Sequence, residues 1–228
     1  MRTTPVIISG LFRDTRQRGD MTPYKTLAEI KSCLKLNPQY GEELIFFAAD
    51  DWCAKKLSSL GLYVEKIMDD APQIARIEAN TRMKFWMCNW ALEEFGEYLW
   101  VDWDAICLKW PDNQFWKTVR KSGNPKFTYI RNYWARVNCA VHYASSKLGD
   151  LREYVGIPLE EPNDELIWMK ILSEKGIFDD DIWLNEMTVN IWLEKDLDLI
   201  TPNTYFAHVR NVELGEHSIQ KYREVVTQ

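Results

Sequence analysis

The stretch Tyr98-Leu99-Trp100-Val101-Asp102-Trp103-Asp104 decides how this chain is interpreted. Its four apolar residues predict a buried strand, and two carboxylates follow where that strand ends. Side chains alternate along a strand, so Asp102 and Asp104 would project to one side and Trp103 to the other. Neighbouring carboxylates repel each other, and a hard cation such as Mg²⁺ relieves that repulsion. The pair is either a metal site or two surface carboxylates that cap the next segment.

Alternating strands and helices lead up to this stretch. Thr22-Pro23 supplies a capping residue and a first-turn proline for the first helix. In order, we predict a strand over 5–10, a helix over 23–36, a strand over 43–49, a helix to about 60, a strand over 62–67 and a helix over 80–95. This alternation is typical of a parallel α/β sheet, whose carboxyl edge is where ligands bind.

The second half of the chain is less regular. Its patterns predict strands over 127–130, 138–143 and 205–209, and helices over 164–172 and 182–193. No linker, internal repeat or low-complexity segment interrupts the sequence. We therefore predict one α/β domain over 1–228, with a mixed, mostly parallel central sheet flanked by helices.

Composition excludes several classes of protein. The net charge of −6 argues against a general affinity for nucleic acid or anionic membranes. A basic cluster at Arg13, Arg16 and Arg18 either meets phosphates or forms a solvated loop. The eleven tryptophans either stack on sugars or fill a tryptophan-rich core.

The cysteines and apolar runs predict where the protein works. Five scattered cysteines without a CxxC pair indicate reduced thiols rather than a disulfide framework or a zinc site. The first apolar run is too short for a signal peptide, and no stretch approaches a transmembrane segment. We expect a soluble cytoplasmic protein, in the host-cell cytoplasm if a virus encodes it.

The segment from Phe95 to Ala105 resembles the signature of GT-A-type nucleotide-sugar glycosyltransferases, in which a helix precedes a strand of the form Y-L-W/Y-x-D-x-D. Shorter matches follow the family's order over roughly 4–210: Val6 to Arg13, Asn138 to Val141, Asn163 to Glu165, and Ala207 to Val209. Compact transferases of viral or bacterial surface glycans are the nearest type. The resemblance implies a nucleotide-binding half over 1–104 and a sugar and acceptor half over 105–228.

The resemblance also implies a metal centre that holds Mn²⁺ or Mg²⁺ on the donor diphosphate. Asp104 would bind the metal directly, Asp102 would be shared between metal and ribose, and His208 would be the third ligand. A histidine shifts the preference slightly toward Mn²⁺. His142 also lies in an apolar strand and competes with His208, and either histidine could instead be an ordinary core residue.

The same resemblance predicts the residues around the donor. Arg82 and Lys84 are two apart on a helix, so they project about 200° apart and cannot both face the site. Asp164 and Glu165 would be the catalytic carboxylates, although a helix N-terminus also favours acidic residues. The predicted donor contacts are Ser9, Gly10, Leu11, Arg13, Asp50, Arg82, Lys84, Asp102, Trp103 and Asn138.

The resulting prediction is a metal-dependent glycosyltransferase that moves a sugar from a nucleotide-diphosphate donor, a UDP-sugar being favoured, to a glycan or glycoprotein acceptor. His208 and Asn138 resemble retaining members, which favours retention. Two alternatives remain open. A sugar-phosphate nucleotidyltransferase is weakened because the first strand lacks a glycine-rich loop. A non-catalytic carbohydrate-binding protein would bind no nucleotide. The sequence contains neither a Walker loop nor GxGxxG.

Overall fold

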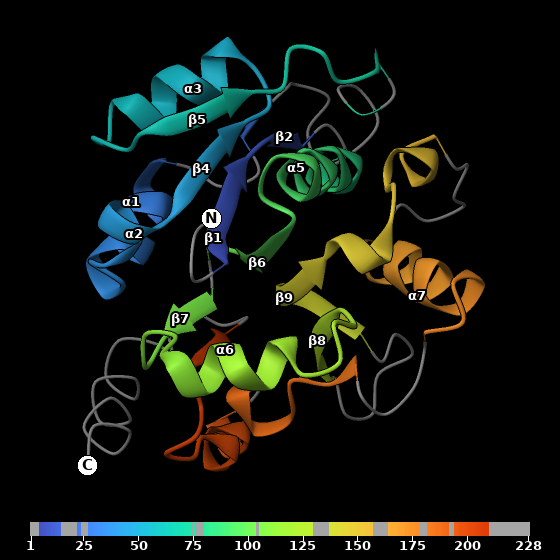
Figure 1. The fold of residues 1–228 in the computed structure, drawn as a ribbon. Coiled ribbons are helices and arrows are strands. Elements are labelled where there is room, and N and C mark those ends of the chain that lie inside the picture. Colours follow the sequence, from blue (N-terminus) through green and yellow to red (C-terminus); the bar gives the residue numbers. More distant parts are fainter. Residues whose placement is uncertain are drawn as a thin grey trace.

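The fold is built on a six-stranded sheet with strand order β5-β4-β1-β6-β9-β8 (Figure 1). The computed structural model describes residues 5–14, 22–23, 27–73, 75, 80–103, 105–129, 137–156, 164–177, 182–191 and 194–209. The strands are β1 (Val6–Leu11), β4 (Ile45–Ala48), β5 (Val64–Ile67), β6 (Glu97–Val101), β8 (Lys126–Tyr129) and β9 (Val137–Ser145). Strands β5, β4, β1 and β6 run parallel, whereas β9 is antiparallel to both β6 and β8. The predicted mixed, mostly parallel sheet is confirmed.

Helices connect the parallel strands and cover the sheet. They are α1 (Leu27–Leu36), α2 (Tyr40–Glu43), α3 (Asp51–Ser58), α5 (Asn80–Phe95), α6 (Asn113–Arg120) and α7 (Asp164–Glu174). The Asp50 side chain caps α3 by accepting a hydrogen bond from the Cys53 backbone N–H at 2.8 Å. Gly96 ends α5 with φ of 78°, a conformation that favours glycine.

Helices α6 and α7 lie on opposite faces of the sheet. Adjacent residues of β9 show this, because successive side chains point to opposite faces. The His142 ring lies 5.0 Å from the Trp168 ring of α7. The Tyr143 hydroxyl instead donates to Glu97, the ion-pair partner of Arg120 on α6. In Figure 1, α7 lies to the right of β9, and α6 lies below it beside β7.

A three-stranded sheet, ordered β10-β11-β7, packs beside the main one. It contains β7 (Ala105–Cys107), β10 (Thr188–Ile191) and β11 (Phe206–Val209). Two residues of the α1–α2 region hold β7 in place. The Tyr40 hydroxyl donates to the Ala105 carbonyl at 2.7 Å, and Asn37 accepts from the Cys107 N–H at 2.8 Å. The segment that follows Asp104 is therefore anchored to the first half of the chain.

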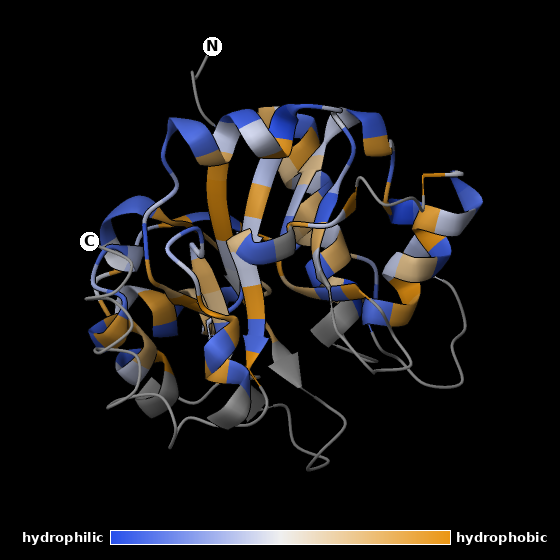
Figure 2. Ribbon diagram, turned by 90° about the horizontal axis from the view of Figure 1, so that it is seen from below, coloured by the Kyte–Doolittle hydropathy of each residue, from blue (hydrophilic) through white to orange (hydrophobic). Residues whose placement is uncertain are grey.

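The core lies between the sheet and its helices. Every residue of β1 is buried, as are all but the first residues of β4 and β6. Figure 2 shows hydrophobic residues concentrated on the central strands, with hydrophilic residues on the outer sides of the helices. Seven buried residues under the smaller sheet form a separate cluster: Ile106, Leu108, Val189, Ile191, Leu197, Ile200 and Ala207. In the part of the chain that the structure describes, no helix is long and apolar enough to cross a membrane.

One predicted element is wrong, and another is shorter than predicted. The helix predicted over 182–193 is a short 3₁₀ turn (Asn185–Met187) followed by β10, which pairs in parallel with β11. A short apolar run fits both a buried strand and a buried helix, and here a tertiary partner decides. The helix predicted over 23–36 is confirmed as α1 over Leu27–Leu36, whereas Pro23 belongs to β3 (Thr22–Pro23), which pairs with β2 (Arg13–Asp14). Helix α6 and strand β7 were not predicted.

Candidate active site

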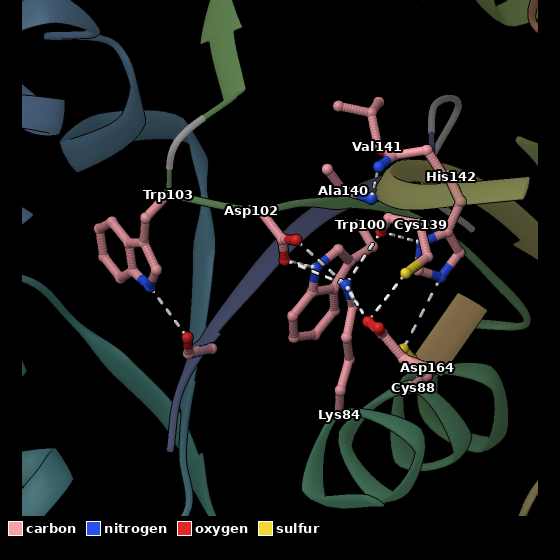
Figure 3. Close-up of polar contacts among 12 residues, drawn as sticks. Lys84, Cys88, Trp100, Asp102, Trp103, Cys139, Ala140, Val141, His142 and Asp164 are labelled. Atoms are coloured by element: carbon pink, nitrogen blue, oxygen red, sulfur yellow. Dashed lines mark hydrogen bonds and ion pairs between the residues drawn. The ribbon is translucent and has the colours of Figure 1, made fainter. Parts of the chain in front are cut away.

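The carboxyl end of β6 turns sharply at the motif. Strand β6 ends at Val101, and the Asp102 N–H donates to the Ala140 carbonyl of β9 at 2.7 Å. The Ala105 N–H then donates to the Asp102 carbonyl at 3.0 Å, which closes a turn. Beyond Val101 the chain leaves the strand, and the side chains of Asp102 and Trp103 point apart (Figure 3). Asp104 lies outside the described residues.

The Lys84 ammonium of α5 lies between two carboxylates. Its Nζ is 3.1 and 3.2 Å from the Asp102 oxygens and 3.3 Å from Asp164 Oδ2, and it donates to the Cys139 carbonyl at 2.9 Å. The same nitrogen lies 5.1 Å from the centroid of the Trp100 ring. The Trp100 indole N–H donates to Asp102 at 2.6 Å. Residues that are distant in sequence thus converge on one buried cation, as Figure 3 shows.

The charges in this cluster stabilise one another. Burial lowers the pKa of Lys84, but the carboxylates of Asp102 and Asp164 more than offset it, and the pKa lies well above its ordinary value. Burial raises the pKa of Asp164, but Lys84 and the Cys139 thiol hold the pKa of that carboxyl below its ordinary value. Both groups are therefore charged at neutral pH. Asp102 and Asp164 keep about a fifth of their side-chain surface exposed, 22% and 23%, so solvent or a ligand can reach them.

The start of α7 is bound to the start of β9. Asn138 Nδ2 donates to Glu165 Oε1 at 3.2 Å, and the Cys139 thiol donates to Asp164 Oδ2 at 2.8 Å. Burial raises the pKa of Cys139 well above its ordinary value, so this thiol is neutral and acts as a hydrogen-bond donor. The sequence predicted Asn138, Asp164 and Glu165 for the site but predicted only a reduced thiol at Cys139. Its position next to Asn138 was the available signal.

The histidine of β9 is part of the core. His142 has no exposed surface, and its Nδ1 lies 2.9 Å from the Cys139 carbonyl. Because a carbonyl only accepts, Nδ1 carries the proton and Nε2 accepts from the Tyr98 hydroxyl at 3.2 Å. Burial, and then Lys84, lower the pKa of His142 to about 3. His142 is therefore neutral, and both of its ring nitrogens have partners within the core.

His208 lies beside the motif through the smaller sheet. The β11–β7 register pairs it with Ala105, the residue after Asp104. Its Nδ1 lies 2.9 Å from Asn190 Oδ1, an arrangement that orients the ring and leaves Nε2 as the nitrogen with a lone pair. Within the described ranges no three His, Cys, Asp or Glu residues gather to hold a metal, and Asp104 is not among those residues. The metal set stays a prediction.

Predicted donor contacts in β1 are buried in the sheet. Ser9 and Leu11 are each 1% exposed. A Cβ at Gly10 would lie 2.5 Å from Met87 Sδ, so a larger residue here would require the Met87 side chain of α5 to shift. The Trp103 indole donates to the Gly10 carbonyl at 2.9 Å, and its ring stacks on Phe46 at 5.1 Å. These residues belong to an interior strand of the sheet. Their direct contact with a donor stays a prediction.

Two further predicted residues make other contacts, and a third is described only in its backbone. Arg82 is buried and donates to the Val155 carbonyl at 2.7 Å, so of the two basic residues on α5 it is Lys84 that faces the carboxylates. Asp50 caps α3 at the end of β4. The Arg13 backbone belongs to β2, and the Arg13 side chain is not among those that the structure describes.

Comparison with known proteins gives structural similarity without sequence similarity. The sequence matches no protein-family model and no curated protein. The structure resembles that of a glycosyltransferase involved in the glycosylation of the major capsid of PBCV-1. That similarity has a TM-score of 0.52 and 13% identity, and it covers 99% of this chain and 100% of that one. The galactosyltransferase LgtC with donor and acceptor sugar analogs also matches, with a TM-score of 0.45, 11% identity and coverage of 97% and 95%. The chain therefore has the fold of a GT-A-type glycosyltransferase.

Proposed function

We propose that this protein is a metal-dependent glycosyltransferase that moves a sugar from a nucleotide-diphosphate donor, preferably a UDP-sugar, to a glycan or glycoprotein acceptor with retention. One observation carries the proposal. In a glycosyltransferase fold, Lys84 lies between Asp102 and Asp164 at the carboxyl end of β6, the edge where open α/β sheets bind ligands. One solved neighbour is involved in the glycosylation of a major capsid, which is consistent with a glycoprotein acceptor.

The charge state of Asp164 supports retention. Cleavage of the bond between sugar and diphosphate leaves positive character on the anomeric carbon, which an ionised carboxylate stabilises. An inverting enzyme needs a carboxylate that accepts the acceptor's proton. Asp164 is a weak base, because Lys84 and Cys139 hold its pKa below the ordinary value. It is better suited to stabilising the sugar than to deprotonating the acceptor.

Asp102, Asp104 and His208 are the residues that would hold Mn²⁺ or Mg²⁺. His208 fits this role, because metal-bound histidines donate their second ring N–H to an acceptor such as Asn190 Oδ1. The ion would supply positive charge for the departing diphosphate. Lys84 contributes by holding Asp102 in one orientation and by keeping Asp164 ionised.

Calorimetric titration with UDP and GDP, with and without Mn²⁺, tests the proposal. We expect Mn²⁺-dependent binding of UDP, and we expect Asp104→Asn to abolish the metal dependence. Asp198→Asn, at an exposed position, is the matched control and should bind as wild type does. If no nucleotide binds, the transferase is excluded and a non-catalytic carbohydrate-binding protein is favoured. If Asp104→Asn keeps its metal dependence, the ligand set is wrong.

Slow hydrolysis of a panel of nucleotide sugars tests the stereochemistry. NMR of the released sugar should show the anomeric configuration of the donor before mutarotation. The opposite anomer would indicate inversion and would contradict the role assigned to Asp164.

We also propose that the protein acts in the cytoplasm. All five cysteines are free, and four of them are buried. Reduced thiols are typical of the cytoplasm.

A further inference from the structure

We propose that the protein has a second sugar-binding site, on the face of the sheet opposite the Lys84 cluster, that holds one unit of the acceptor glycan while another unit reacts. The inference rests on the proposed function. A pocket of about 400 Å³ lies between α6, the start of β8 and the segments around Trp183 and Asn203. Its volume is within the range of roughly 300–1,000 Å³ that small-ligand sites occupy.

The pocket is separate from the candidate active site. Gln114, Thr118 and Val119 bring α6 into its wall, and α6 covers the face to which Tyr143 points. Lys84 and Asp164 lie on the other face, with His142 and α7. Two further strands, β9 and β8, separate β6 from the outer edge of the sheet, and each adds about 4.8 Å. A ligand in this pocket therefore cannot be the reacting sugar.

A half-buried tryptophan forms part of the wall. Trp183 bridges in parallel to Phe127 of β8, and the Leu184 N–H donates to the Phe127 carbonyl at 2.8 Å, so the backbone here is fixed to the sheet. Trp183 is partly buried, packs against the main core and lines the pocket. Such a ring presents a rigid apolar face with little conformational entropy to lose, which suits the apolar face of a pyranose.

Ordered polar groups stand near this ring. The Glu186 carboxylate accepts from Asn203 Nδ2 at 2.9 Å and from the Thr201 hydroxyl at 3.3 Å, so its oxygens are oriented before any ligand binds. Gln114 and Thr118 are four residues apart on α6 and therefore lie on the same side of that helix. Together these groups offer amide, carboxylate and hydroxyl partners, which both donate to and accept from sugar hydroxyls.

The charges favour a saccharide over a phosphate. Lys121 and Lys126 line the pocket, but Glu186 lies there too, and the Lys126 ammonium donates to the Ser122 hydroxyl at 3.0 Å. A phosphate site would be expected to concentrate positive charge or backbone N–H groups. A polyhydroxylated, uncharged unit matches this mixed lining better.

Binding of simple sugars tests the site directly. Saturation-transfer NMR would use methyl glycosides of glucose, galactose, mannose, xylose and N-acetylglucosamine, without nucleotide or metal. We expect signal from at least one sugar. The double variant Gln114→Ala/Thr118→Val, which changes exposed side chains, should weaken the binding at least tenfold, as should Trp183→Ala. Trp183→Phe should keep most of it, and Trp52→Ala on α3 is the matched control. No signal from any sugar, or binding that survives both pocket variants, would overturn the proposal.

The sugar-binding test and the nucleotide-binding test can fail separately. If UDP binds but no sugar binds, the pocket assignment fails and the transferase stands. If sugars bind in the pocket but no nucleotide binds, the pocket stands and the transferase fails. For an active enzyme, the pocket variants should raise KM for an oligosaccharide acceptor several-fold and leave donor hydrolysis unchanged. Equal effects on both reactions would contradict a remote anchor.

Discussion

Two buried side chains, Lys84 of α5 and His142 of β9, lie on the same face of the sheet, yet Lys84 is charged and His142 is neutral. Lys84 contacts two carboxylates and stays charged, whereas His142 makes hydrogen bonds with the Cys139 carbonyl and the Tyr98 hydroxyl and stays neutral. The Cys139 carbonyl serves both groups, accepting from Lys84 at 2.9 Å and from His142 at 2.9 Å. Burial penalises charge at both positions, so the difference comes from the partners.

The comparison shows where this fold places its charges. Asp102 and Asp164 keep part of their surface exposed, whereas His142 has none. A charged cluster at the open edge of the sheet can exchange one of its partners for a ligand. A neutral hydrogen-bonded histidine, packed between Phe127 and Trp168, cannot do so and fixes the geometry behind the cluster.

Removing the cation should have the largest effect. In Lys84→Met two partly buried carboxylates lose their counter-charge, and we expect a loss of about 3–5 kcal/mol in the free energy of unfolding. Glycosyl transfer should fall to background. Urea denaturation and donor hydrolysis measure the two effects. Lys170→Met, on an exposed part of α7, is the matched control. A stable, active Lys84→Met would show that the cluster is dispensable.

A double-mutant cycle measures how strongly Lys84 and Asp164 stabilise each other. Asp164→Asn alone removes one partner of Lys84 and should destabilise the protein by about 1–3 kcal/mol. In the Lys84→Met background the same change removes an unpaired charge and should cost nothing or stabilise the protein. Unfolding free energies of the four proteins give the coupling. Additive effects would mean that Lys84 and Asp164 do not stabilise each other.

The neutral histidine should appear in the pH dependence of stability. The native pKa of His142 is about 3, below its unfolded value, so between those values the unfolded chain binds more protons. Its contribution is complete above about pH 6.5 and is lost as the pH falls, with a slope approaching about 1.4 kcal/mol per pH unit. The difference between wild type and His142→Phe should show this slope between pH 6.5 and 4.5. Parallel pH profiles would indicate a histidine that becomes protonated in the folded state.

A surface carboxylate should show the smallest effect. Asp112 caps α6 by accepting from the Phe115 N–H at 3.0 Å, and the same oxygen accepts from the Tyr205 hydroxyl at 2.8 Å. Asp112→Asn keeps that acceptor and loses only the exposed pair with Lys109, so thermal unfolding should change little. Asp112→Ala should cost about 1 kcal/mol. If the asparagine variant is as unstable as the alanine variant, the charge matters here as it does at Lys84.

Local patterns in the sequence predicted the first half of the chain well. The strands at β1, β4 and β6 are largely apolar runs, and helices α3 and α5 lie where the sequence predicted helices. Each of these signals lies within a few residues, so no distant partner is needed to interpret it. The position of Asp102 at the edge of the sheet follows from the same signals, as does the divergence of Arg82 from Lys84.

Tertiary structure decided the features that depend on distant partners. The segment Thr188–Ile191 is a strand because β11 pairs with it. Lys84, rather than Arg82, serves the site because Asp164, 80 residues away in sequence, lies beside it. Cys139 belongs to the site because its thiol donates to Asp164 of α7. His142 belongs to the core, where its ring accepts from the Tyr98 hydroxyl. The sequence by itself determined that Asp102 lies at the carboxyl end of β6. Only packing determined what holds Asp164 ionised, because the energy of a buried charge depends on its neighbours in space.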